Sequence, residues 1–181
     1  MSNILVLYKS KYGSTKQYAE WIAADLSADL YEASSFSSGS WEDYSTIVYC
    51  GGIYANNING VKTIIKNQAK LSGKKIIIVA CGLSNPNNKE LFERIENGLY
   101  RKLPQTIKDG VNFFLLRGGV TYSELRFFDD KVLKMLEKML QSKNPQTLGP
   151  EEREMLEVLG KDFSFVDRAS IQPIVEYCKA R

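Results

Sequence analysis

"ILVLYKSKYGSTKQYAEWIA", residues 4–23, joins an apolar run to a helical pattern through a turn of small hydroxyl residues and one glycine. The apolar run covers Ile4–Tyr8, and Tyr18 and Ile22 are spaced as on one face of a helix. A turn from a strand into a helix leaves backbone N–H groups unpaired at the positive end of the helix dipole, where a phosphate binds well. This stretch therefore predicts a strand, an anion-binding turn and a helix.

The turn itself is rich in hydroxyl groups, which can donate hydrogen bonds to an anion. Gly13 lets the backbone approach an oxygen closely, because glycine has no Cβ. The Gly-Lys-Ser/Thr ending of a P-loop and the three spaced glycines of a dinucleotide fingerprint are both missing from it. Helix capping by Ser10 or Ser14 is the alternative that needs no ligand. The turn consists of Ser10, Lys11, Tyr12, Gly13, Ser14 and Thr15.

Four apolar runs recur along the chain with helical patterns between them. Such near-continuous runs are typical of parallel strands that helices cover on both faces. A more polar run, Asp29–Ala33, fits an edge strand. The alternation therefore predicts an open α/β sheet. The four runs are Ile4–Tyr8, Thr46–Cys50, Ile76–Cys81 and Val111–Leu116.

The second half of the chain predicts a long helix from about Tyr122 to Gln141. We expect one side of it, with Leu125, Phe128, Val132, Met135, Leu136 and Met139, to pack in the core, and Asp129 and Asp130 to be solvated.

The alternation of strands and helices is interrupted at residues 143–165. Within this segment, Pro150 followed by two acidic residues indicates the start of a short helix. We interpret this segment as an insertion before the last helix, about Ser170–Lys179, of a single domain covering residues 1–181.

Composition narrows the chemistry that the chain can perform. It contains no histidine, which removes the commonest general base and metal ligand, and its three cysteines are too widely spaced for a zinc site or a disulfide framework. We therefore expect no metal and no catalytic side chain, and an organic cofactor is an economical source of chemistry. Cys50 and Cys81 end neighbouring strands, where we expect packing, with a redox pair as the alternative.

Charge and hydropathy indicate where the protein acts. The net charge is +3, and the basic excess lies after residue 60. Such an excess fits an ordinary solvated surface. The alternatives are attraction of an anionic substrate or of an acidic partner, or peripheral contact with a membrane surface. The scattered basic residues argue against nucleic acid. No apolar run approaches the roughly 20 residues of a membrane span, and the N-terminus lacks a signal pattern, so we expect a cytoplasmic protein.

Three further strand ends are rich in glycine and lie on the same edge of the sheet as the first turn. They carry Gly51-Gly52, Gly82 and Gly118-Gly119. In open α/β sheets, ligands bind outside the carboxyl ends of the strands where the winding reverses. Four such turns on one edge predict a ligand site.

With these motifs, nearly the whole chain resembles flavodoxin-like domains that bind FMN. Their phosphate loop has hydroxyl–x–Thr–Gly–x–Thr character, and here Tyr12 stands at the usual Thr position. Within that family the chain is similar to menaquinone-dependent protoporphyrinogen oxidases at residues 117–122 and at Phe127, Phe128, Asp129 and Lys131. The resemblance implies a three-layer α/β sandwich with a five-stranded parallel sheet in the order 2-1-3-4-5.

The resemblance also implies where FMN binds. Residues 10–15 would hold its phosphate, the loops after the third and fourth strands would flank the ring, and Tyr54 is the expected aromatic contact, with a surface tyrosine as the alternative. The implied cofactor-binding residues are Ser10, Lys11, Tyr12, Gly13, Ser14, Thr15, Gly51, Gly52, Ile53, Tyr54, Ala55, Asn56, Cys81, Gly82, Leu83, Ser84, Asn85, Gly118 and Gly119.

Three functions follow from this resemblance. The first is electron transfer by an FMN carrier, with a redox partner protein or a small-molecule acceptor such as a quinone. The second is an FMN-dependent oxidoreductase of the protoporphyrinogen oxidase or quinone reductase type, in which Arg117, Arg126 and Lys131 would suit porphyrin carboxylates. The third is a signalling or binding domain of the same topology that has no flavin. A phosphoryl-receiver domain is disfavoured, because Lys-Ser-Lys-Tyr at residues 9–12 replaces the acidic cluster it needs.

Overall fold

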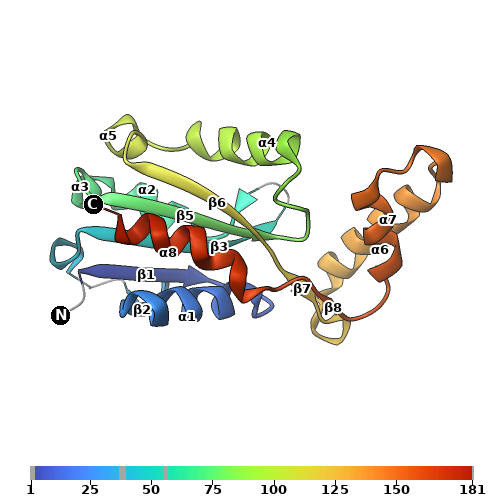
Figure 1. Ribbon diagram of the computed structural model, residues 1–181, viewed down its shortest axis with the longest axis horizontal. Coiled ribbons are helices and arrows are strands. Elements are labelled where there is room, and N and C mark those ends of the chain that lie inside the picture. Colours follow the sequence, from blue (N-terminus) through green and yellow to red (C-terminus); the bar gives the residue numbers. More distant parts are fainter. Residues whose placement is uncertain (1–2, 37–39, 55–56, 181) are drawn as a thin grey trace.

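The computed structural model describes residues 3–36, 40–54 and 57–180, and its centre is a twisted sheet (Figure 1). Its parallel strands lie in the order β2-β1-β3-β5-β6, and β4 pairs antiparallel with β3. Counting the parallel strands alone, this is the predicted order 2-1-3-4-5. The strands are β1 Ile4–Lys9, β2 Asp29–Glu32, β3 Thr46–Tyr54, β4 Asn57–Ile58, β5 Lys75–Gly82 and β6 Val111–Arg117.

Helices cover both faces of the sheet, because successive strand residues point to opposite sides and both sets are apolar. On one face Val6, Val48 and Ile77 pack with α1 and α8. On the other face Leu5 and Ile47 pack with α2, α3, α4 and α5. The three-layer prediction is therefore confirmed. The helices are α1 Ser14–Leu26, α2 Lys62–Lys66, α3 Gln68–Leu71, α4 Lys89–Tyr100, α5 Gln105–Lys108 and α8 Gln172–Lys179, with 3-10 turns η1 Trp41–Asp43 and η4 Arg168–Ile171.

After β6 the chain leaves the sheet and forms a projecting unit beyond the carboxyl ends of the strands (Figure 1). We call residues 119–164 the α6–α7 hairpin. Its two helices lie side by side, its base is the antiparallel pair β7 and β8, and Val120, Leu133, Leu140, Met155 and Leu159 form its own apolar cluster. Its elements are β7 Gly119–Val120, η2 Tyr122–Glu124, α6 Phe127–Gln141, η3 Pro145–Thr147, α7 Pro150–Val158 and β8 Phe163–Ser164.

Helix α6 differs from its prediction in its start and in its buried face. It begins at Phe127, because Tyr122–Glu124 form a 3-10 turn and Arg126 is extended. Val132, Met135 and Met139 are 65%, 73% and 48% exposed, so the prediction that they lie in the core was wrong. The helix packs on α7 rather than on the sheet, and this contact uses the face that carries Leu133 and Leu140.

The interruption at residues 143–165 contains the expected short helix, α7, which begins at Pro150. The carboxylate of Glu152 accepts the N–H of Gly149 at 3.0 Å, which satisfies one donor at the start of α7. The departure from the sheet begins earlier than predicted, at β7. Within the described residues, no helix combines the length and apolar character needed to cross a membrane.

Candidate functional site

A pocket of about 410 Å³ opens at the carboxyl ends of the sheet strands, and α6 forms its far wall. Its volume lies in the range of about 300–1,000 Å³ that is usual for small-molecule sites. Most of the residues that were predicted to bind a cofactor line it. These are Ser10, Tyr12, Ser14, Thr15, Gly52, Ile53, Tyr54, Cys81, Gly82, Leu83, Ser84, Gly118 and Gly119.

The N-terminus of α1 lies at this pocket. Gly13 has φ +92°, a left-handed conformation that favours glycine, and its carbonyl accepts the N–H of Gln17 at 3.0 Å. Its own N–H donates to Ser10 Oγ at 3.1 Å, and this hydrogen bond stabilises the turn. No side chain of residues 3–36, 40–54 or 57–180 caps the N-terminus of α1. Among the described residues, the N–H groups of Ser14, Thr15 and Lys16 have no protein acceptor. They are therefore available to an anion.

Two hydroxyl groups tie this turn to its neighbours. Ser14 Oγ accepts the N–H of Gly119 at 3.1 Å, which leaves its own O–H free to donate. Thr15 is buried, and its hydroxyl is hydrogen-bonded to Cys81. Burial raises the pKa of the Cys81 thiol to about 12, although the bond to Thr15 acts in the opposite direction. The thiol therefore stays neutral and contributes no charge to the pocket.

An aromatic pair forms another part of the pocket wall. The rings of Tyr12 and Tyr54 lie edge to face with centroids 6.5 Å apart, and Lys11 Nζ is 5.2 Å from each centroid. Burial raises the pKa of the Tyr54 phenol, so that side chain is neutral at ordinary pH. Tyr54 therefore lines the pocket, and its contact with a planar ligand stays a prediction.

Asp129 of α6 is a pocket residue that the sequence analysis placed in solvent, and that prediction was wrong. Its carboxylate accepts hydrogen bonds from Lys11 Nζ and from the Tyr12 hydroxyl. Burial works to raise the pKa of Asp129, but these hydrogen bonds and the charge of Lys11 outweigh it and hold the pKa below its ordinary value. The sequence did contain an indication of this position. Asp129 lies four and seven residues before Leu133 and Leu136, so the three share one helical face, and that face lines the pocket.

The far wall of the pocket is apolar, and none of its individual residues was predicted as a cofactor-binding residue. Leu91 and Ile95 come from α4, and Leu125, Val132, Leu133 and Leu136 come from the hairpin. The sequence offered no means of separating these side chains from ordinary core residues, because pocket walls and core show the same helical spacing.

Several predicted site residues do not line the pocket. A Cβ on Gly51 would lie 2.6 Å from Ile58 Cγ2, so this glycine serves the close packing of β4 on β3. The ammonium group of Lys11 is held by Asp129. Gly13 lines a second, adjoining hollow of about 440 Å³. Ala55 and Asn56 lie outside the described residues.

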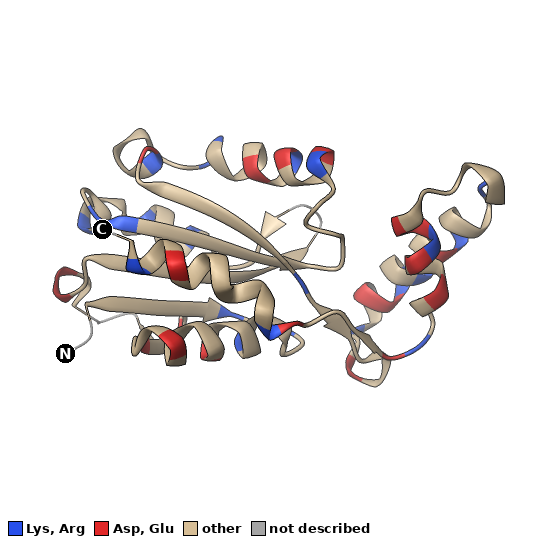
Figure 2. Cartoon of the chain, viewed as in Figure 1, with Lys and Arg blue, Asp and Glu red and all other residues tan. Residues whose placement is uncertain are grey.

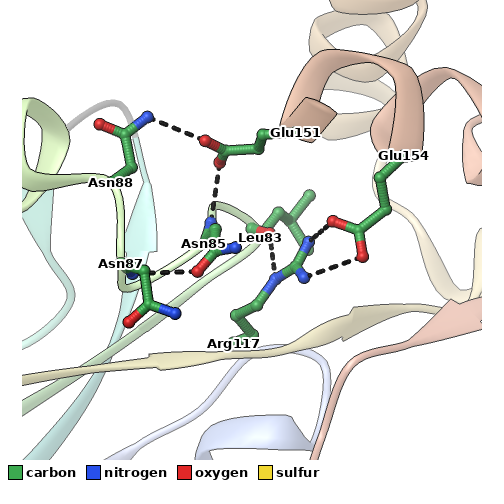
Figure 3. A network of polar contacts seen from close by, with 7 residues as sticks. All are labelled: Leu83, Asn85, Asn87, Asn88, Arg117, Glu151 and Glu154. Atoms are coloured by element: carbon green, nitrogen blue, oxygen red, sulfur yellow. Dashed lines mark hydrogen bonds and ion pairs between the residues drawn. The ribbon is translucent and has the colours of Figure 1, made fainter. Parts of the chain in front are cut away.

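Asn85 and Arg117 form hydrogen bonds with acidic residues of α7, as Figure 3 shows. The N–H of Asn85 donates to Glu151 Oε1 at 2.8 Å, so this residue faces α7 and not the pocket. The guanidinium of Arg117 donates to both carboxylate oxygens of Glu154, at 3.2 and 2.8 Å. The expectation that Arg117 meets substrate carboxylates therefore conflicts with its geometry.

Charged residues and metal ligands point to no other site. In the view of Figure 2, basic and acidic segments are interspersed along α4, α6 and α7. The part of the chain that the structure describes places no three His, Cys, Asp or Glu side chains together for a metal ion.

The chain has a doubly wound α/β fold with a pocket at the carboxyl edge of its sheet. The model of the flavodoxin domain family matches residues 5–147, and the chain belongs to that family. It is therefore one of the flavodoxin-like redox proteins. A search of curated proteins found no match.

Several solved structures are similar to this chain. The Trp repressor binding protein of Bacillus subtilis is 18% identical, with 64% of this chain and 83% of that chain covered and a TM-score of 0.44. A putative flavoprotein of Bacteroides eggerthii is 16% identical, with 77% and 98% covered and a TM-score of 0.45. A flavoprotein of Lactobacillus acidophilus in complex with FMN is 16% identical, with 65% and 93% covered and a TM-score of 0.39.

Proposed function

We propose that this protein binds FMN in the pocket and transfers electrons to or from a redox partner protein or a small-molecule acceptor. The observation that carries the proposal is the start of α1, beside a pocket with aromatic and apolar walls. There the N–H groups of Ser14, Thr15 and Lys16 lack acceptors among the residues that the structure describes. A flavin mononucleotide combines an anionic phosphate, which suits those donors, with a flat aromatic ring, which suits the aromatic and apolar walls of the pocket.

The residues present fit this ligand. The three N–H groups and the Ser10 and Ser14 hydroxyls would hold the phosphate, and Ile53, Tyr54 and Leu83 would border the ring. When bound, the flavin supplies the electron-transfer chemistry itself. The chain's tasks are to bind and orient it and to exclude water. A proton donor from the chain is not needed, which agrees with the missing histidine.

An enzyme is the second candidate, and one observation favours it. The apolar wall that Leu91, Ile95 and Leu136 contribute would suit an apolar substrate. This arrangement supports an FMN-dependent oxidoreductase of the protoporphyrinogen oxidase or quinone reductase type. The engagement of Arg117 with Glu154 removes one of the three cations expected to meet porphyrin carboxylates. Oxidation of protoporphyrinogen with a quinone acceptor would favour the enzyme, and electron uptake from a reductase without that activity would favour the carrier.

The direct test is a titration of flavin-free protein with FMN and, in parallel, with riboflavin, which lacks the phosphate. We expect flavin fluorescence to fall with one FMN bound per chain, and riboflavin to bind at least about tenfold more weakly, because it cannot use the α1 donors. Equal affinity for the two ligands would mean that the phosphate is not held there. No change in fluorescence with either ligand would refute flavin binding altogether.

A further inference from the structure

The loop between β5 and α4 is attached to the α6–α7 hairpin at three points. Two of them belong to Glu151 of α7, whose carboxylate accepts the backbone N–H of Asn85 and the side-chain amide of Asn88, each at 2.8 Å (Figure 3). The oxygen of the same Asn88 amide, Oδ1, accepts the N–H of Leu91 at 3.1 Å and caps α4. Asn88 therefore cannot turn its amide over without losing the cap.

The third point of attachment runs through Arg117 at the end of β6. Its Nε donates to the carbonyl of Leu83 at 3.2 Å, while its two terminal nitrogens bind the carboxylate of Glu154 on α7. The guanidinium carbon lies 3.5 Å from the centroid of Phe165, and the side chain is 14% exposed. Such a bidentate, stacked and largely buried arrangement fixes both orientation and charge.

The attached loop is a wall of the pocket. Gly82, Leu83 and Ser84 line it, and Leu83 is the residue whose carbonyl Arg117 holds. A turn follows, in which Asn85 Oδ1 accepts the N–H of Asn87 at 2.9 Å. Movement of α7 would therefore move the loop and the pocket wall together.

We propose that Glu151 and Glu154 are positioning residues for the flavin: they fix the loop from Leu83 to Asn88 as a pocket wall, and Glu154 neutralises the Arg117 cation, which donates to the carbonyl of Leu83 in that wall. This inference rests on the proposed flavin binding. The α6–α7 hairpin then acts as a support for the cofactor site, although Glu151 and Glu154 do not touch the pocket themselves.

The role of Glu151 can be tested by an exchange of donor and acceptor, measured without flavin. Glu151→Gln leaves one acceptor oxygen where the carboxylate had two, so either the Asn85 N–H or the Asn88 amide loses its acceptor. In Asn88→Asp a carboxylate meets the Glu151 carboxylate, which removes the donor but keeps an acceptor for the α4 cap. The double variant E151Q/N88D restores a matched donor and acceptor. Glu157→Gln, on the exposed side of α7, is the control.

Hydrogen exchange of the Asn85 amide in the flavin-free protein is the readout. Each single variant should exchange roughly tenfold faster at Asn85, as expected for one weakened hydrogen bond to a charged acceptor, and the double variant should return toward wild type. Both single variants should also bind FMN more weakly than Glu157→Gln does. Exchange unchanged in the single variants, or no recovery in the double variant, overturns the role of Glu151.

The role of Glu154 is tested by the midpoint potential of the bound flavin. Glu154→Gln leaves an uncompensated Arg117 cation, which favours the more negative reduced flavin, so the potential should shift to a more positive value. Arg117→Met added to Glu154→Gln should bring it back, and Glu157→Gln should leave it unchanged because an exposed charge is screened. A potential equal to wild type in Glu154→Gln overturns this role. Loss of flavin binding by the wild type would instead contradict the proposed function.

Discussion

Lys11 and Asp129 are hydrogen-bonded across 118 residues of sequence and join the turn after β1 to α6. The carboxylate of Asp129 also accepts the Tyr12 hydroxyl, and the oxygen of that hydroxyl accepts the N–H of Arg126 at 3.1 Å. The side chains of Lys11 and Asp129 are 23% and 25% exposed, so water only partly screens the pair. This contact holds the hairpin against the turn that forms one end of the pocket.

Asp129→Asn should destabilise the protein by about 1–2 kcal/mol at pH 7, between the usual values for an exposed ion pair and for a hydrogen bond to a buried charge. The folded state lowers the pKa of Asp129 below its ordinary 3.8 and raises the pKa of Lys11 above its ordinary 10.5, through their mutual hydrogen bond. The carboxylate's contribution is therefore present above pH 3.8 and lost as the pH falls through the folded pKa. The ammonium's contribution is lost only at pH above 10.5.

Urea unfolding of the wild type and of Asp129→Asn at several pH values measures the difference between their free energies of unfolding. It should stay constant near neutrality and shrink in acid. Asp130→Asn is the matched control, because Asp130 pairs one turn away with Lys134, whose side chain is 63% exposed, and its loss should cost less than about 0.5 kcal/mol. Equal losses of unfolding free energy in Asp129→Asn and Asp130→Asn would show that the Lys11–Asp129 contact stabilises the protein no more than the Asp130–Lys134 pair does.

Gly13→Ala should destabilise the protein by about 1–2 kcal/mol, the strain of placing a Cβ at positive φ. No atom lies within 4 Å of the added Cβ, so the effect is conformational and not a clash. Gly98→Ala in α4 is the control. Its Cβ is equally unobstructed but its backbone is helical, and it should stabilise the protein by about 0.4–1 kcal/mol. Thermal or urea unfolding that gave both changes the same sign would contradict the conformational assignment of Gly13.

The features of the fold that could be predicted have local causes. The strand around Val48 and the strand around Ile77 are buried on both faces, so each appears in the sequence as a continuous apolar run. The anion-binding turn was visible because Gly13 and its hydroxyl neighbours stand directly between a strand and a helix. The order of the strands came from the family resemblance, because spacing alone does not say which strands pair.

The features that could not be predicted depend on contacts between distant segments. Asn85 was expected to face the cofactor, but Glu151, 66 residues later, takes its N–H. Asp129 is satisfied by Lys11, which no local pattern connects to it. Helix α6 has apolar residues on two faces, and the periodicity did not say that α7 covers the face with Leu133.

The two faces of α6 should respond differently to substitution. Met135→Gln should change the free energy of unfolding by less than about 0.5 kcal/mol, because Met135 is 73% exposed and the two residues have similar helix propensity. Leu140→Ala should cost about 2–4 kcal/mol, because Leu140 is buried in the hairpin cluster. Urea unfolding followed by circular dichroism compares them. A large loss in Met135→Gln would mean that the exposed face is covered in solution.

The three cysteine thiols should be unreactive in the folded protein. All are buried and free, and burial raises the pKa of Cys81 to about 12 and of Cys178 to about 11, against the opposing effects of Thr15 and of the Lys75 charge. Burial also raises the pKa of Cys50. At pH 8 fewer than about one thiol in a thousand is then a thiolate, which is the reactive form.

Titration with an aromatic disulfide reagent tests this expectation. We expect slow modification of the native protein at pH 8 and rapid release of three equivalents per chain in guanidinium chloride, in agreement with packing roles for all three residues. Cys50 and Cys81 belong to the same apolar cluster, so a redox pair there would need both thiols to become accessible together. Fast loss of two native thiols, with a new Cys50–Cys81 disulfide found by peptide mapping, would contradict packing and favour a second redox centre beside the flavin pocket.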